Sequence, residues 1–106
     1  MNTKLLMVLS GMAAISISGQ VSADAASDYT TNCNSCHNVA IAPALQAPGV
    51  GDKAAWAPRI AKGMDALYHT ALNGSSVNPV MMPRGGSSLG DDALKAVVDY
   101  MVSQSK

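Results

Sequence analysis

The pattern of apolar and polar positions predicts a helical chain whose clearest periodicity lies at the C-terminal end. Over residues 91–106 apolar side chains recur at helical spacing, and Asp91 and Asp92 precede them as residues that favour a helix N-terminus. The apolar positions are Leu94, Val97, Val98, Met101 and Val102. We expect this stripe to pack against an N-terminal helix through Tyr29.

Three further segments have helical character, and none of the chain shows the alternation of a half-buried strand. The predicted helices cover residues 24–36, 53–63, 64–74 and 91–106. Asp52 is the expected N-cap of the second, which should break or kink at Pro58 before Gly63 ends it. Asn73 and Gly74 close the third. The expected fold class is therefore all-α, with three to five helices.

Two segments between these helices are predicted to be loops because prolines and glycines interrupt them. Residues 38–51 read "NVAIAPALQAPGVG", and residues 75–90 read "SSVNPVMMPRGGSSLG". We expect the first loop to lie on the surface or to cover a cofactor.

The start of the chain, residues 1–23, has the layout of a secretory signal peptide. Lys4 precedes an apolar run over residues 5–17, and small residues at Val21 and Ala23 follow. The run is shorter than the roughly 20 residues that cross a bilayer as a helix. We expect cleavage after Ala23 and export of a single domain, residues 24–106, to a bacterial periplasm.

The composition of residues 24–106 indicates a domain with too little hydrophobic volume to form a stable core by itself. The segment has six Lys and Arg residues, seven Asp and no Glu. Its net charge is therefore not basic, which argues against nucleic-acid binding. There is no Phe, and the aromatic residues are Trp56, Tyr29, Tyr68 and Tyr100. A domain this small usually needs a disulfide, a metal or another staple, and a large apolar cofactor would supply the missing hydrophobic volume.

The segment "CNSCH" holds the only two cysteines, Cys33 and Cys36, followed directly by His37. Two such thiols could form a disulfide, a redox-active pair, half of a zinc site, or thioether links to haem. A disulfide would close too small a loop to stabilise much, and a thioredoxin-like pair needs a βαβ context. A zinc site needs four ligands, and only His69 remains.

Covalent haem makes use of all three residues. Cysteines at i and i+3 lie on one helical face about 5–6 Å apart at Cβ, so both sulfurs can reach the two vinyl groups along one porphyrin edge. The adjacent histidine can then reach the iron. The C-x-x-C-H motif thus predicts one covalently bound haem c, with Cys33 and Cys36 as attachment sites and His37 as an axial ligand.

A second axial ligand would select the function. Met64 and Met101 fall in helical patterns, where methionine usually fills the core. His69 lies in a predicted helix and is more simply explained as a solvated or packed residue. Met81 and Met82 instead lie in "PVMMPRGG", a loop bounded by proline and glycine that can hold a thioether at a fixed place. An open position is the remaining alternative.

These motifs together resemble a class I cytochrome c, with most similarity to the bacterial cytochrome c5 group. The resemblance covers nearly all of residues 24–106: "CNSCH" matches the haem-binding motif, and "APGVGDKAAWAPRIAKGMDALYHTALNG" is similar to the middle segment of the family. "MMPRGG" resembles its Met-Pro loop and "DDALKAVVDYM" its C-terminal helix. The fold that this implies is a small cytochrome c fold packed around one haem c.

The resemblance also implies roles for individual residues. By position, Cys33 and Cys36 correspond to the thioether sites and His37 to the proximal ligand. Pro48 corresponds to the proline whose carbonyl orients the proximal histidine, in preference to Pro43.

Two correspondences concern the far side and the rim of the haem. Trp56 and Arg59 match residues that face the haem propionates. The methionine is ambiguous, because Met82 keeps the following proline whereas Met81 keeps the spacing to Arg84; we expect Met82, with Met81 as the alternate. Serines stand where some c5 proteins carry a second cysteine pair, so no additional disulfide is expected.

Iron ligated by a histidine and a methionine has no free position for a substrate, which leaves one-electron Fe(III)/Fe(II) cycling. The expected function is therefore not enzymatic: a soluble periplasmic electron carrier between a quinol-linked donor and a terminal oxidase or reductase. A small apolar patch at the haem edge would give transient contacts. Whether two copies form a weak homodimer through that edge is left open, and no stable membrane insertion is expected.

Two alternatives belong to other classes. A haem sensor or small peroxidase would have an open or labile sixth position and would need an acid–base residue near the iron, for which only His69 is available. A zinc-binding or dithiol protein would contain no haem at all.

Overall fold

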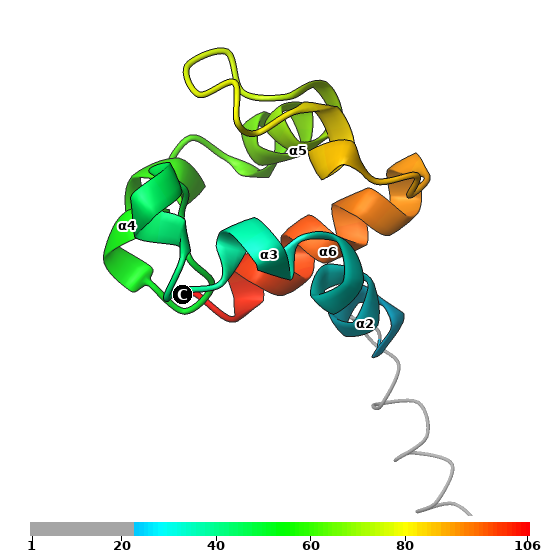
Figure 1. Cartoon of the computed structure of the whole chain (residues 1–106), viewed down its shortest axis with the longest axis horizontal. Coiled ribbons are helices and arrows are strands. Elements are labelled where there is room, and N and C mark those ends of the chain that lie inside the picture. Colours follow the sequence, from blue (N-terminus) through cyan, green and yellow to red (C-terminus); the bar gives the residue numbers. More distant parts are fainter. Residues whose placement is uncertain (1–22) are drawn as a thin grey trace, which may run out of the picture.

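A computed structural model describes residues 23–106, so the predicted signal peptide lies outside the described residues except for Ala23. This part contains five α-helices and two short 3₁₀ helices (Figure 1), and no strand occurs within it. The elements are α2 (Ala23–Asn32), α3 (Asn34–His37), η1 (Ala42–Leu45), α4 (Lys53–Ile60), α5 (Met64–Asn73), η2 (Pro83–Gly86) and α6 (Asp91–Ser103). The all-α prediction is confirmed. Within residues 23–106 no helix has the length and apolar character that crossing a membrane requires.

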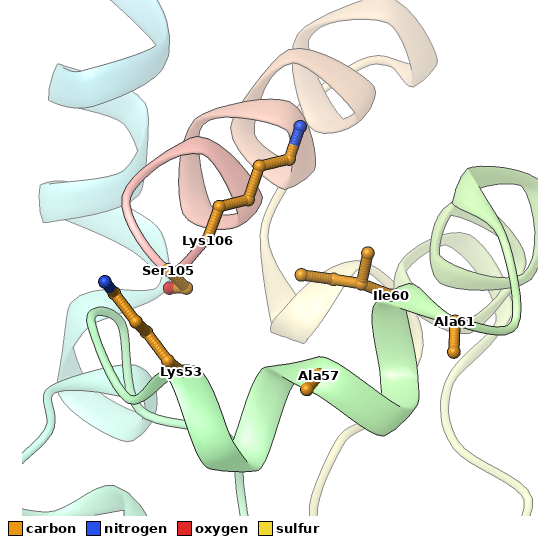
Figure 2. A pocket seen from close by; sticks show the side chains of 6 residues that line it. All are labelled: Lys53, Ala57, Ile60, Ala61, Ser105 and Lys106. Atoms are coloured by element: carbon orange, nitrogen blue, oxygen red, sulfur yellow. The ribbon is translucent and has the colours of Figure 1, made fainter.

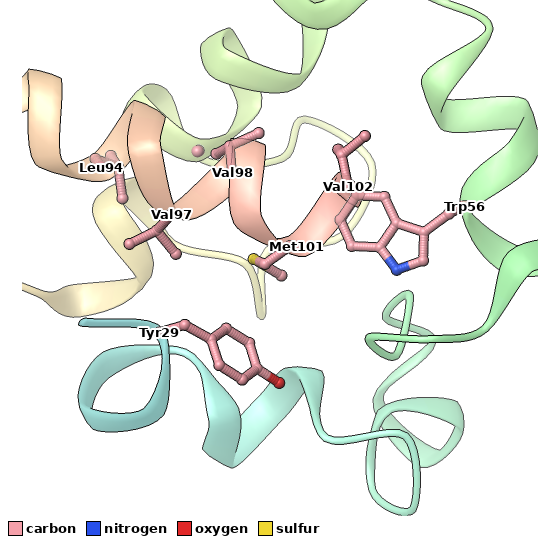
Figure 3. Close-up of a cluster of buried hydrophobic side chains, with 8 residues drawn as sticks. Tyr29, Trp56, Leu94, Val97, Val98, Met101 and Val102 are labelled. Atoms are coloured by element: carbon pink, nitrogen blue, oxygen red, sulfur yellow. The ribbon is translucent and has the colours of Figure 1, made fainter. Parts of the chain in front are cut away.

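The core forms where α6 packs against α2 and α5, and Figure 3 shows its buried side chains. They are Tyr29, Trp56, Ala71, Leu94, Val97, Val98, Met101 and Val102. The helical stripe of α6 therefore contacts Tyr29 of α2, as its spacing predicts. Trp56 of α4 joins the same cluster from the other end of α6.

The prediction of one continuous helix over residues 24–36 is wrong, because the chain leaves the helix at Cys33. The Cys33 backbone has φ −124° and ψ −23°, and α3 starts at the next residue. The Asn32 side chain donates to the carbonyl of Asp28 at 3.0 Å, a local bond that competes with helix continuation. Cys33 therefore lies at the junction of two helices, and Cys36 lies in the short helix α3.

The start of α4 follows the sequence prediction, and the helix then runs through Pro58 without a break. The Asp52 carboxylate accepts a hydrogen bond from the Ala55 amide at 3.1 Å and caps the helix. The sequence predicts a break or a kink at Pro58, and no break occurs, because α4 continues to Ile60. Proline removes only the donor to the carbonyl of Ala54, and the helix ends two residues later, so the disruption is confined to its last turn.

The two predicted loops each contain one 3₁₀ turn and meet each other in space. The Asn78 side-chain amide donates to the carbonyl of Leu45 at 3.0 Å, which joins the loop of residues 75–90 to η1. In Figure 1 α3 lies near the centre of the view, and α5 and the loop that follows it lie above. The cysteine-containing segment and the methionine-containing loop thus come from different parts of the fold.

Candidate functional site

The turn of residues 33–37 sets two thiols and an imidazole side by side. The amides of Cys36 and His37 both donate to the carbonyl of Cys33, at 3.2 and 3.0 Å. Both cysteines are free and partly exposed. Within residues 23–106 no three His, Cys, Asp or Glu side chains converge as a metal ion would require. The thiols and the imidazole of this turn therefore do not share a common centre.

The environment of Cys33 keeps its thiol protonated. Burial raises the Cys33 pKa, and the neighbouring Cys36 and Asp28 raise it further. A reactive dithiol needs the opposite shift, since the thiolate is the nucleophile. The raised pKa of Cys33 therefore disfavours a reactive thiolate at this position.

The His37 side chain has a fixed direction because a backbone carbonyl binds one of its ring nitrogens. His37 Nδ1 lies 2.9 Å from the carbonyl oxygen of Pro48. A carbonyl can only accept, so Nδ1 carries the proton and Nε2 keeps its lone pair. Burial lowers the His37 pKa, the Pro48 bond opposes this effect, and the charge of Arg59 lowers the pKa again. The ring is thus neutral at pH 7, with Nε2 free to bind a metal.

Residues 48–51 form the support for this imidazole. The Val50 amide donates to the His37 carbonyl at 2.8 Å, and Trp56 Nε1 donates to the carbonyl of Gly49 at 2.9 Å. A Cβ at Gly49 would lie 2.7 Å from the Val39 Cα, so only glycine allows this approach of the two loop segments. The His37 backbone and side chain are therefore both held by the same short stretch.

Trp56 and Arg59, the residues expected at the haem propionates, lie on the same side of the site. The Trp56 ring is buried, with its centroid 6.5 Å from that of His37. Its ring N–H is donated to Gly49, and Arg59 Nη1 donates to the Ala55 carbonyl at 2.6 Å. Both side chains thus have backbone partners here, and their contact with propionates stays a prediction.

On the opposite side, the backbone of Met81 anchors the methionine loop to the end of α5. The Ser75 amide donates to the Met81 carbonyl at 2.9 Å. Gly74 has φ +87°, and a Cβ there would lie 3.1 Å from the Met81 oxygen and from Pro83. Both the positive φ and this close approach require glycine at the end of α5.

Met82 follows in this anchored loop and is 52% exposed, with its sulfur close to Gly86 of the same loop. Its carbonyl accepts a hydrogen bond from the Gly85 amide at 2.9 Å, and Pro83 restricts the backbone of the residue before it. Arg84 then ties the loop to the start of α6, through a 2.8 Å bond to the Leu89 carbonyl and a salt bridge with Asp91. The Met82 thioether is therefore an accessible donor on a well-fixed loop.

His69, the remaining candidate ligand, has the surroundings of a solvated helix residue. It is exposed on α5, and its Nδ1 is 3.2 Å from the side-chain amide of Asn73 in the next turn. This contact joins two neighbours on the same helix and does not link His69 to the cysteine turn or to the methionine loop. The position of His69 therefore does not support a function as an acid–base group in this site.

Around the core, the protein leaves a set of apolar side chains only partly buried. Several pack against the core cluster but are only partly buried by protein: Cys33, Val50, Ile60, Met64, Leu67, Tyr68, Leu72, Leu89 and Tyr100. They come from the cysteine turn, from α4 to α6 and from the loops between them. Together with a free imidazole Nε2 and an exposed thioether, this lining fits a haem.

Sequence reasoning missed one residue of the support. Ser105, near the C-terminus, accepts a hydrogen bond from the Gly51 amide at 2.9 Å. Nothing in the local sequence marks this serine, because its partner is 54 residues away.

A family model matches residues 20–101 of the chain; its description is "Cytochrome C oxidase, cbb3-type, subunit III". Cytochrome c-555 of Chlorobaculum tepidum is 43% identical over 100 residues, which cover 89% of this chain and 90% of that protein. Cytochrome c5 of Azotobacter vinelandii is 42% identical over 72 residues, covering 65% of this chain and 80% of that protein.

A solved structure is similar over most of the fold. It matches with a TM-score of 0.69 and 38% sequence identity, over 82% of this chain and 100% of that one. It is described as "Crystal structure of electron transfer complex of nitrite reductase with cytochrome c".

Proposed function

This chain belongs to the class I c-type cytochromes, similar to cytochrome c5, and on that premise we propose that it is a diffusible periplasmic carrier in a respiratory chain. It is a mono-haem electron carrier with covalently bound haem c, and not an enzyme. The haem supplies one-electron cycling between Fe(III) and Fe(II). The protein contributes the residues that hold the haem and the surface that meets its redox partners.

On the proximal side, Cys33 and Cys36 provide the two thioether links and His37 Nε2 binds the iron. The observation that carries this assignment is the 2.9 Å contact between His37 Nδ1 and the Pro48 carbonyl. It fixes the tautomer and the ring orientation, and it raises the basicity of the nitrogen on the other side of the ring.

On the distal side, Met82 is the ligand. The Met81 backbone joins the loop to the end of α5, whereas Met82 is about half exposed on the same loop. Pro83 and the Arg84 interactions limit how far the loop can move. A methionine sulfur stabilises the ferrous state and raises the reduction potential.

The partners are redox proteins, with a quinol-linked donor and a terminal oxidase or reductase as acceptor. The similar cytochrome c in the solved complex was bound to nitrite reductase, which supports a reductase of this kind. Four exposed apolar side chains lie on the two loops that the Asn78–Leu45 bond joins: Val39, Ile41, Val77 and Val80, which we call the edge patch. With charges nearly balanced, such a patch suits brief, low-area contacts.

The proposed location rests on the N-terminal segment. We propose cleavage after Ala23 and export of residues 24–106, because the signal-like segment ends where the helical domain starts. Mass spectrometry of the mature protein from a periplasmic extract should give Asp24 as the first residue. A protein that keeps residues 1–23 would contradict this assignment.

Absorption spectra of the exported protein test the function directly. Haem should stay with the polypeptide after acid–acetone extraction, give a low-spin reduced spectrum, and ignore carbon monoxide. Ready binding of carbon monoxide would show an open sixth position and would contradict the carrier assignment in favour of a sensor or peroxidase. Haem that is removed by extraction would contradict the roles of Cys33 and Cys36.

A further inference from the structure

Ser105, the residue before the last, is buried and is hydrogen-bonded to the loop behind His37. Ser105 is 2% exposed, and it is the one buried polar residue of the core in residues 23–106. Figure 2 shows it just beyond the end of α6, facing the start of α4 beside Lys53. It contributes to the wall of a pocket of about 420 Å³, together with apolar residues of α4.

The Ser105 hydroxyl has two partners with different functions. It donates to the carbonyl of Met101 at 2.8 Å, and it accepts from the amide of Gly51 at 2.9 Å. The first bond is an ordinary bond back to the preceding turn of a helix. The second is a tertiary bond that a side chain without an acceptor oxygen could not form.

Gly51 is part of the stretch that orients His37. The Pro48 carbonyl accepts from His37 Nδ1, the Gly49 carbonyl accepts from Trp56, and the Val50 amide donates to the His37 carbonyl. The hydrogen bond from the Gly51 amide to the Ser105 hydroxyl fixes the last residue of this stretch, residues 48–51. It connects the loop to α6, whose buried face belongs to the main core.

We propose that Ser105 is a positioning residue for the axial histidine, acting through Gly51 and the Pro48 carbonyl; this rests on the proposed ligation of iron by His37. The C-terminal helix thereby fixes the direction of the imidazole and its hydrogen bond. Without the Ser105–Gly51 hydrogen bond, residues 48–51 move more freely and the hydrogen bond from His37 Nδ1 to the Pro48 carbonyl weakens. A less basic imidazole stabilises ferric iron less, so the reduction potential rises.

The test compares Ser105→Ala, Ser105→Thr and Ser103→Ala in the complete haem-loaded protein. Ser103 is the matched control, because its hydroxyl also bonds back to α6, at the Tyr100 carbonyl, but it is exposed. Ser105→Ala should speed hydrogen exchange of the Gly51 amide roughly 5- to 10-fold, the effect of one lost hydrogen bond. It should also raise the reduction potential and shift the His37 ring resonances. Ser103→Ala should change none of these, and Ser105→Thr should restore the wild-type values.

Two results would overturn the proposal. One is an unchanged potential and unchanged His37 resonances in Ser105→Ala. The other is an equal shift in Ser105→Thr, because packing and not the hydroxyl would then be responsible. Failure of the proposed ligation would be seen separately, as wild-type protein whose iron lacks the histidine resonances.

Discussion

The Nδ1 atom of His37 lies 2.9 Å from the carbonyl oxygen of Pro48, eleven residues further along the chain. A proline carbonyl suits this function because the ring restricts its own backbone, and here the following Gly49 approaches Val39 too closely for any side chain. The histidine direction therefore depends on how residues 38–51 fold back on themselves. Contacts that fix this loop and the methionine loop should accordingly control both stability and ligation.

Substitution of Gly49 by alanine should damage the proximal support. The new Cβ would lie 2.7 Å from the Val39 Cα, so backbone must move, at a cost of about 1–3 kcal/mol in the free energy of unfolding. Urea unfolding of the haem-loaded protein measures this cost. Gly90→Ala is the control, since its Cβ would meet open space at an ordinary φ of −69°, and it should cost under about 1 kcal/mol. Equal costs at the two glycines would contradict the tight approach at Gly49.

The methionine ligand can be identified by single substitutions. Met82→Ala should abolish the ferric sulfur-to-iron absorption band and allow carbon monoxide to bind, because it removes the thioether that projects from the loop. Met81→Ala should keep the band, because the Met81 contacts that anchor the loop are backbone bonds. Loss of the band only in Met81→Ala would reverse the assignment. Survival of the band in both variants would exclude a methionine ligand from this loop.

The salt bridge between Arg84 and Asp91 should stabilise the protein in a pH-dependent way. The Arg84 hydrogen bond and charge hold the Asp91 pKa below its ordinary value of 3.8. A lowered carboxylate pKa means that the stabilisation is fully present above the ordinary value and is lost as the pH falls through the lowered one. The free energies of unfolding of wild type and Asp91→Asn should therefore differ at neutral pH and converge in strong acid.

The neighbouring Asp92→Asn variant is the control for this effect, because it removes a charge from the same first turn of α6. If both variants lose the same stability, the effect belongs to the helix terminus and not to the salt bridge. The methionine loop would then be held by other contacts.

The edge patch should control electron transfer between two molecules of this protein. Val77 is 91% exposed, and a Val77→Asp charge at the contact should slow electron self-exchange roughly 10-fold or more, because two like charges would face each other. The rate can be measured by NMR in mixtures of oxidised and reduced protein. Ala54→Asp on α4 gives the same net charge at an exposed position outside the patch and should change the rate little. A similar slowing in both variants would show a net-charge effect and no specific patch.

Short stretches of the sequence were enough to predict the chemistry and the most regular elements. Cys33, Cys36 and His37 are close neighbours in the chain, so the motif specifies its cofactor without reference to the fold. The apolar stripe of α6 and the Asp52 cap of α4 are likewise local, because each depends only on the spacing of a few residues. Apolar periodicity and helix capping depend only on residues close together in the chain, so they can be recognised without knowledge of the rest of the fold.

The way in which these parts meet could be seen only in the folded chain. The Ser105–Gly51 bond has no local signal, and the local features at Cys33 and Pro58 did not by themselves decide between interruption and continuation of the helix. A loop takes the conformation in which its backbone groups find partners, and here those partners lie far away in the chain. The sequence therefore predicted the residues that would hold a haem, whereas the folding of residues 48–51 against His37 gave the imidazole its direction.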